Sequence, residues 1–167
     1  MAAPSIRVGH GFDVHQFSAD PGRRLVLGGC EFEGEPGLVG HSDADAVAHA
    51  VAEALLGAAG LGDLGEHYPD SDPQWAGADS MAILADVVIR LGDAGWVPGN
   101  VDCSVVCERP RLATRRDDMQ QRLSAVVGAP VTVKGRRPEG LGSLGRGEGI
   151  ACTAVALIVR SEAPSHD

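Results

Sequence analysis

Asp13 and His15 are the first residues of the chain whose types and spacing suggest chemistry. They stand two positions apart in an extended segment, GHGFDVHQF (residues 9–17). Because alternate residues of a strand project from the same face, this carboxylate and this imidazole can converge on one cation. His49 would complete a three-ligand site with an open fourth position, which is typical of catalytic zinc. The alternatives are solvated polar residues at a strand end and a neutral core histidine.

His49 lies in an alanine-rich segment that predicts a helix. Asp45 precedes it by one turn on the same face, so its carboxylate is placed to accept the second imidazole N–H and fix the ligating tautomer. His41 and Ser42 come just before the helix, where free backbone N–H groups and the helix dipole favour an anion. Ser42 is also the predicted N-cap, in capping-box spacing with Asp45.

Two further segments have the composition of ligand-binding loops. The three aspartates of Asp63–Asp72 suit Mg²⁺ beside a phosphate, although a surface turn explains the same pattern. Gly145–Gly149 (GRGEG) places an arginine and a glutamate between glycines, as in anion-binding nests or in a tight turn with an ion pair. Arg111, Arg136 and Arg137 offer guanidinium groups suited to phosphate, or lie on a solvated surface.

The composition is that of a globular chain. Its 167 residues are 44% hydrophobic, 22% charged and 4% aromatic, so we expect one domain over 1–167 with an aliphatic core at about 6–160. The termini, including the final EAPSHD, are expected to fray. No apolar run approaches the roughly 18 residues of a membrane span, and the N-terminus lacks the layout of a secretory signal. We therefore expect a cytoplasmic protein without a membrane partner.

The net charge of −9 is unevenly distributed. Residues 1–99 hold 4 basic and 15 acidic side chains, whereas residues 100–167 hold 10 and 8. The asymmetry fits carboxylates that hold a metal in the first part and arginines that meet an anion in the second, or mere drift. An acidic chain without a basic stripe is not expected to bind nucleic acid. The four cysteines form no CxxC pair and are expected to be reduced and buried.

Strands and helices alternate along the chain, which predicts a layered α/β or α+β domain. Strands are expected at Ser5–Phe12, Arg24–Cys30, Val101–Cys107, Val131–Lys134 and Ile150–Val159. Helices are expected in 41–62, Asp79–Gly95 and Thr114–Val127, and a polar loop in Asp63–Gly77. The last strand is apolar on both faces. Helices can cover one face, so a second subunit is expected over the other.

These pieces together resemble the 2-C-methyl-D-erythritol 2,4-cyclodiphosphate synthases of the non-mevalonate isoprenoid pathway. The matching stretches are residues 9–17, 40–73, 99–112 and 139–157, within a match over about 7–160. The most specific are DVH, HSDAD with a histidine further down the helix, and GRGEGIA. The resemblance implies an α+β domain, a layered sheet with helices on one face, ferredoxin-like or chorismate-mutase-like, that assembles as a homotrimer with sites between subunits.

The resemblance also implies the reaction. The 2-phosphate of 4-diphosphocytidyl-2-C-methyl-D-erythritol 2-phosphate attacks the β-phosphorus, a cyclic diphosphate forms, and CMP leaves. Asp13, His15 and His49 would hold Zn²⁺, and Mg²⁺ or Mn²⁺ would bridge the phosphates. An isoprenoid diphosphate would be a further ligand in the trimer core. Because the reaction is intramolecular, positioning and charge neutralisation supply most of the catalysis.

The family's functional residues map onto this chain as follows. His41 would steady the transition state, and Arg137 stands where the family has a catalytic threonine. Substrate contacts are implied for Asp13, Val14, His15, His41, Ser42, Asp63, Leu64, Gly65, Tyr68, Pro69, Asp70, Ser71, Asp72, Cys107, Glu108, Arg109, Pro110, Arg111, Leu112, Ala113, Arg136, Arg137, Pro138, Glu139, Ser143 and Arg146. Cys107 to Ala113 would form the cytidine pocket, and Glu139 would lie near the second ion.

One departure from the family falls in the segment after Lys134. The family's Lys-Ala-Thr-Thr-Thr-Glu is replaced by Lys134-Gly135-Arg136-Arg137-Pro138-Glu139. We expect Arg137 to point at the diphosphate, with Gly135 providing room for its longer side chain. Two other functions fit the same residues: a zinc-dependent hydrolase of another phosphate ester, and a trimeric binding protein that captures nucleotide or isoprenoid diphosphate without turnover.

Overall fold

A four-stranded sheet forms the centre of the computed structural model, which describes residues 6–161. The strands are β1 (Ile6–Gln16), β6 (Gly149–Arg160), β4 (Trp96–Val106) and β5 (Val131–Arg136), in that spatial order. β1 and β4 both pair antiparallel with β6, whereas β4 and β5 are parallel. The short strands β2 (Val26–Leu27) and β3 (Cys30–Glu31) form a separate hairpin.

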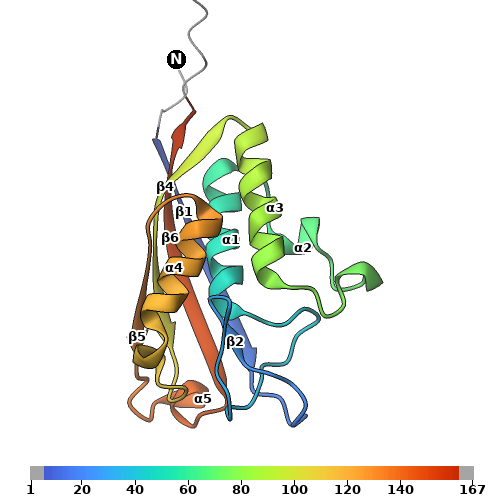
Figure 1. Ribbon diagram of the computed structural model, residues 1–167, viewed down its shortest axis with the longest axis vertical. Helices are drawn as coiled ribbons and strands as arrows, with labels where there is room; N and C mark the ends of the chain where they lie inside the picture. The colour runs from blue at the N-terminus through green and yellow to red at the C-terminus, as the bar shows by residue number, and fades with distance from the viewer. Residues whose placement is uncertain (1–5, 162–167) are drawn as a thin grey trace, which may run out of the picture.

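Three long helices cover one face of this sheet (Figure 1). They are α1 (Ala46–Ala59), α3 (Ser80–Asp93) and α4 (Arg116–Val127). Shorter helical turns are α2 (Leu64–His67), α5 (Gly142–Gly145), and 3-10 turns at Pro73–Trp75 and Leu112–Thr114. None of the helices between residues 6 and 161 is long and apolar enough to cross a membrane. The sheet and these helices together make the protein a mixed α+β domain, as predicted.

The order of the elements corrects one fold expectation. Counting the sheet strands and the long helices that link them, the chain runs β-α-α-β-α-β-β. Ferredoxin-like folds run β-α-β-β-α-β, so that name does not describe this sheet. Here the parallel pair β4–β5 is joined by the crossover helix α4, and β6 then inserts between β1 and β4.

Two glycines of β1 let helix α1 lie directly on the strand. A Cβ added at Gly11 would come within 2.0 Å of the Ala50 carbonyl oxygen, and one at Gly9 equally close to that of Ala54. Neither separation is sterically possible, so any larger residue would push the helix away. The same strand carries Asp13 and His15 and the same helix carries His49. This close packing therefore sets the distance between the predicted ligands.

Helix α1 is capped by a different residue from the one predicted. Asp45, not Ser42, is the N-cap, and its carboxylate accepts hydrogen bonds from the N–H groups of Val47 and Ala48. The Ser42 hydroxyl instead accepts from the Ala44 N–H. Both residues fit the cap pattern by type, but the chain bends at Ser42, Ala44 has a φ of 59°, and the helix begins only after Asp45, whose side chain is fully buried.

Two other sequence expectations need correction. Arg24–Cys30 is not one strand, because Gly28 and Gly29 adopt φ of 56° and 71° and turn the chain back on itself. The expected loop Asp63–Gly77 contains α2 and a 3-10 turn, each capped by an aspartate at its start. The expectation that EAPSHD frays falls on residues outside the described part of the chain.

The other face of the sheet carries exposed apolar side chains. Alternate residues of β1 point away from the helices; Val8 is 65% exposed, Val14 is 51% exposed, and Val155 lies beside them on β6. A single chain leaves this face uncovered, as expected from the apolar last strand.

Candidate functional site

Asp13, His15 and His49 meet at the junction of β1 and α1. The Asp13 Oδ2 atom lies 2.9 Å from His15 Nε2 and 3.0 Å from His49 Nδ1. One ligand atom from each residue lies within 4.8 Å of the other two. A zinc ion bonds such donors at about 2.0–2.2 Å, so three atoms at this spacing can share one ion and leave a fourth position open.

The hydrogen bonding of His15 supports this interpretation. Its Nδ1 atom lies 2.6 Å from the Val39 carbonyl oxygen, which can only accept a hydrogen bond, so Nδ1 carries the proton. In the neutral ring the lone pair is then on Nε2, which is buried and faces Asp13 Oδ2 at 2.9 Å. A buried nitrogen left with a free lone pair, beside a carboxylate, is the arrangement that a metal ligand requires.

Asp45 does not orient His49, contrary to the prediction. Its two carboxylate oxygens are taken by the backbone N–H groups of α1 and of Gly28 and Gly29. The second nitrogen of His49, Nε2, lies instead 2.9 Å from Ser80 Oγ on α3. The helix-turn spacing did bring Asp45 near this region, but the cap position directs its side chain toward the β2–β3 hairpin.

The electrostatics of the cluster favour a carboxylate beside imidazoles. Burial opposes ionisation of Asp13, but hydrogen bonds from His15 and His49 and their charges outweigh it and lower its pKa to about 2. Burial alone would lower the pKa of His15, but the hydrogen bond and charge of Asp13 raise it above its ordinary value. In the absence of a metal, a proton therefore partly takes the place of the cation.

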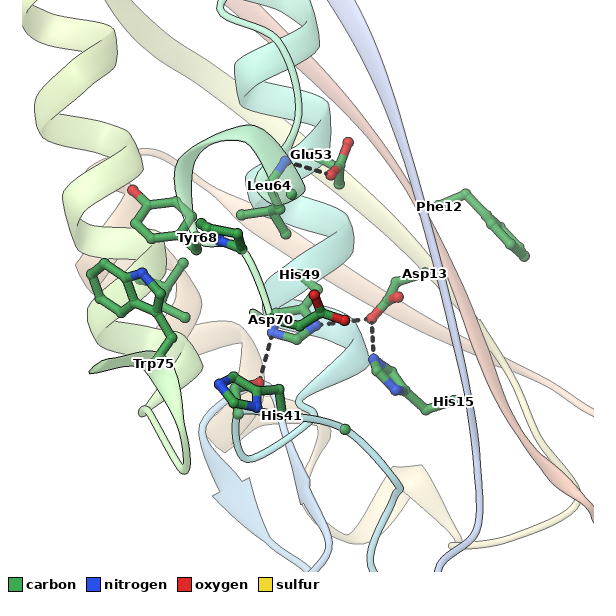
Figure 2. Close-up of a pocket in the computed structure, with 15 residues that line it drawn as sticks. Phe12, Asp13, His15, His41, His49, Glu53, Leu64, Tyr68, Asp70 and Trp75 are labelled. Atoms are coloured by element: carbon green, nitrogen blue, oxygen red, sulfur yellow. Dashed lines mark hydrogen bonds and ion pairs between the residues drawn. The ribbon is translucent and has the colours of Figure 1, made fainter. Parts of the chain in front are cut away.

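The cluster opens into a cavity of about 520 Å³. Figure 2 shows His41, Tyr68 and Trp75 on the wall opposite Asp13 and His15. The predicted substrate residues in its lining are Asp13, His15, His41, Ser42, Leu64, Gly65, Tyr68, Pro69 and Asp70. The α2 turn that supplies several of them is tied to α1 by a 2.8 Å hydrogen bond from the Leu64 N–H to Glu53 Oε1.

A second cavity, of about 470 Å³, lies where β4 and β5 end. Its lining includes the predicted residues Cys107, Glu108, Pro110, Arg111, Leu112, Ala113, Arg136 and Arg137, together with Arg116. Four arginines around one hollow make it suited to an anion. An added Cβ at Gly135 would first meet Leu112 Cδ1, at 3.1 Å. Glycine here therefore makes room for Leu112, in addition to any room it gives Arg137.

The remaining predicted site residues line neither of these two cavities. Val14 projects from the open face of the sheet, Asp63 and Asp72 cap short helical turns, and Arg109 lies over the Phe17 ring. Ser71, Pro138, Glu139, Ser143 and Arg146 also lie outside both linings. Within GRGEG, Arg146 donates to Glu148 at 2.6 Å, the ion pair given as an alternative to anion binding.

Sequence reasoning missed several residues at the site, among them Ser80 and Trp75. Ser80 contacts His49 across 31 positions of sequence, and only its place at the start of a predicted helix distinguished it. Trp75 lines the first cavity and packs edge-on against Tyr68 with ring centroids 5.1 Å apart. A tryptophan within a polar loop was the signal that could have found it, because large apolar rings are rarely left in solvated turns.

Comparison with known proteins places this geometry in context. The chain is 50% identical over 164 residues to a bifunctional enzyme IspD/IspF of Anaeromyxobacter dehalogenans, covering 96% of this chain and 42% of that protein. It therefore spans about two-fifths of the length of such relatives. It is 49% identical to the 2-C-methyl-D-erythritol 2,4-cyclodiphosphate synthase of Thermosynechococcus vestitus, covering 92% of this chain and 96% of that one.

Solved structures of proteins with related names have a similar fold. The bifunctional IspDF of Campylobacter jejuni superposes with a TM-score of 0.89 at 36% identity, covering 94% of this chain and 43% of that one. A CDP complex of IspF from Plasmodium falciparum superposes with a TM-score of 0.82 at 27% identity, covering 96% and 100%. The YgbB family matches residues 6–159, nearly the whole described chain. The chain belongs to the YgbB family.

Proposed function

We propose that the protein cyclises 4-diphosphocytidyl-2-C-methyl-D-erythritol 2-phosphate to 2-C-methyl-D-erythritol 2,4-cyclodiphosphate with release of CMP. The observation that carries this proposal is the Asp13, His15 and His49 cluster, with the buried Nε2 of His15 directed at Asp13, at the wall of a cavity in a YgbB-family chain. Relatives that bear the synthase name match nearly end to end.

The residues of the first cavity have distinct tasks in this reaction. Asp13, His15 and His49 would hold Zn²⁺, which supplies a Lewis acid that polarises the β-phosphate. His41 and Ser42 line the cavity beside the cluster and would contact the phosphate groups there, and His41 is exposed. The α2 segment and Tyr68 enclose the methylerythritol portion. Nucleophile and leaving group belong to one substrate, so holding both phosphates in line supplies most of the rate.

The second cavity would receive the cytidine nucleotide. It lies by β4 and β5. The predicted metal ligands lie where α1 packs on β1, at the opposite edge of the sheet. One substrate spans both regions most simply when they come from neighbouring subunits. We therefore propose a chorismate-mutase-like domain over 1–167 that assembles as a homotrimer through its open apolar face, which includes Val8, Val14 and Val155.

Further ligands follow from the same arrangement. Glu139 would help to hold a second divalent ion, Mg²⁺ or Mn²⁺, which would neutralise charge on the substrate phosphates, and an isoprenoid diphosphate would bind in the trimer core. Arg137 would face the diphosphate in place of the family's threonine. The four buried free thiols suit a reducing, cytoplasmic location.

The test is incubation of the purified protein with the diphosphocytidyl substrate, Zn²⁺ and Mg²⁺, followed by phosphorus NMR and CMP release. We expect a cyclic diphosphate and CMP in equal amounts, both abolished by a chelator and by His49→Ala. The matched control is Arg122→Ala, which removes an exposed side chain of α4 that lines neither of the two cavities. Release of inorganic phosphate would indicate a hydrolase, and nucleotide binding without turnover a binding protein. Either result would overturn the proposal.

A further inference from the structure

A chain of hydrogen bonds runs from Asp43 through Ser80 to His49 and links the predicted metal ligand on α1 to α3. The Ser80 hydroxyl lies 2.9 Å from His49 Nε2, and it also donates a short hydrogen bond to Asp43 Oδ1. The Ser80 N–H, at the first position of α3, donates to the other oxygen of Asp43 at 3.2 Å. Ser80 is 1% exposed, so water does not compete for these contacts.

The directions of these hydrogen bonds define the tautomer of His49. A hydroxyl has a single proton, and a carboxylate can only accept, so the Ser80 proton is directed at Asp43. Ser80 can then only accept from His49, which requires the imidazole proton on Nε2. When an ion is bound, the neutral ring then has its lone pair on Nδ1, the nitrogen that lies 3.0 Å from Asp13 Oδ2 and faces the cluster. In the metal-free structure this nitrogen instead donates to the Asp13 carboxylate, and the ion would replace that proton.

We propose that Ser80 and Asp43 are positioning residues that hold His49 as the Nε2–H tautomer and aim its Nδ1 at the metal ion. This inference rests on the proposed metal site and assigns a role to two residues outside it. Partners that hydrogen-bond the second nitrogen of a ligating histidine fix its orientation, and their loss typically costs 10–100-fold in metal affinity. A carboxylate behind the hydroxyl strengthens the acceptor, because it polarises the Ser80 O–H bond.

Ser42 is the competing partner for the same nitrogen. Its hydroxyl lies 3.3 Å from His49 Nε2 and 3.4 Å from Ser80 Oγ. It is also engaged by the Ala44 N–H at 3.1 Å, and no hydrogen bond connects it to Asp43. The shorter contact and the carboxylate behind it favour Ser80, and Ser42 remains free to meet substrate.

The test measures zinc binding alone, without substrate. Zn²⁺ affinity is determined by competition with a chromophoric chelator for the parent, Ser80→Ala, Ser80→Thr and Asp43→Ala. The matched control is Ser124→Ala, which removes a hydroxyl that accepts from the Val131 N–H far from the cluster. Long-range proton–nitrogen NMR of the zinc-loaded proteins then identifies which nitrogen of His49 carries the proton and whether that proton is protected from exchange.

We expect Ser80→Ala to weaken Zn²⁺ binding 10–100-fold and to remove protection of the Nε2 proton of His49. Asp43→Ala should act in the same direction, while Ser80→Thr and Ser124→Ala should retain the parent affinity. Unchanged affinity and an unchanged Nε2–H signal in Ser80→Ala would overturn the inference, as would a zinc-loaded parent with the proton on Nδ1. A parent that binds zinc through Nδ1, loses it in Ser80→Ala and releases no CMP would support this inference while contradicting the proposed activity.

Discussion

Asp13 and His49 lie 36 positions apart in the chain, yet Asp13 Oδ2 and His49 Nδ1 are 3.0 Å from each other. The contact depends on backbone packing, because Gly11 lets α1 rest against β1 with no side chain between them. A metal site of this kind is therefore assembled by the strand–helix interface rather than by a single binding loop.

Gly11→Ala should damage stability and metal binding together. Its added Cβ would lie 2.0 Å from the Ala50 carbonyl oxygen, so α1 must move away and carry His49 from Asp13. We expect a loss of about 1–3 kcal/mol in the free energy of unfolding, measured with urea, and a clear loss of Zn²⁺ affinity. Gly57→Ala is the control. A Cβ added there would come no closer than 3.8 Å to the His10 carbonyl oxygen, and alanine is favoured over glycine within a helix, so this variant should stabilise the protein by about 0.5–1 kcal/mol. A Gly11→Ala protein with the parent's zinc affinity would contradict this argument.

Asp45→Ala should be among the most destabilising single substitutions in α1. The buried carboxylate accepts four backbone hydrogen bonds, two from α1 and two from the turn between β2 and β3. Removing it leaves several buried N–H groups without partners, so we expect a loss of at least about 3 kcal/mol in urea unfolding. Asp79→Ala removes an exposed cap with one backbone bond and should cost only about 1 kcal/mol. Equal losses for the two variants would show that the tie to the β2–β3 turn contributes nothing.

The ligand set could be predicted from sequence because it depends on regular geometry. Alternation along β1 places Asp13 and His15 on one face, and a helix after a polar cap places His49 toward the sheet. The role of Ser80 could not be predicted in this way, because it depends on how α3 packs beside α1. No local pattern in the chain encodes that contact.

The predicted contact between Asp45 and His49 was wrong because it, too, depends on tertiary packing. The spacing of Asp45 from His49 fits one helical turn, but the same residue fits an N-cap, and sequence alone does not say which hydrogen bonds it makes. The structure resolves the competition, because the glycine turn of the β2–β3 hairpin offers two further N–H donors. The glycines of GHGFDVH were likewise visible in the sequence, but their purpose became clear only from the position of α1.

Zinc binding should release protons near neutral pH. Burial lowers the pKa of His15, but the hydrogen bond and charge of Asp13 outweigh it and raise the pKa above 6.5. In the metal-free protein this proton stabilises the fold fully below pH 6.5, and its contribution is lost as pH rises through the folded pKa. The ion requires the neutral ring, so binding within this window displaces up to about one proton from His15.

Titration calorimetry at about pH 7 in two buffers of different ionisation enthalpy measures that release. The observed heat should differ between the buffers for the parent and for His10→Ala, since His10 lies outside the cluster. Identical heats in both buffers for the parent would mean that His15 is already neutral before the ion binds.

Arg137→Ala should lower kcat/KM for CMP release by on the order of tenfold or more, because it removes one charge-assisted hydrogen bond to phosphate. Arg137 is exposed at the rim of the arginine-lined cavity, so its removal should leave urea unfolding unchanged. Arg137→Thr installs the residue that the resemblance implies at this position and should retain more activity than alanine. Arg122→Ala removes an exposed arginine of α4 that lines neither site cavity and should leave kcat and KM unchanged. If Arg137→Ala also leaves both constants unchanged, Arg137 is a surface residue and the diphosphate is held without it.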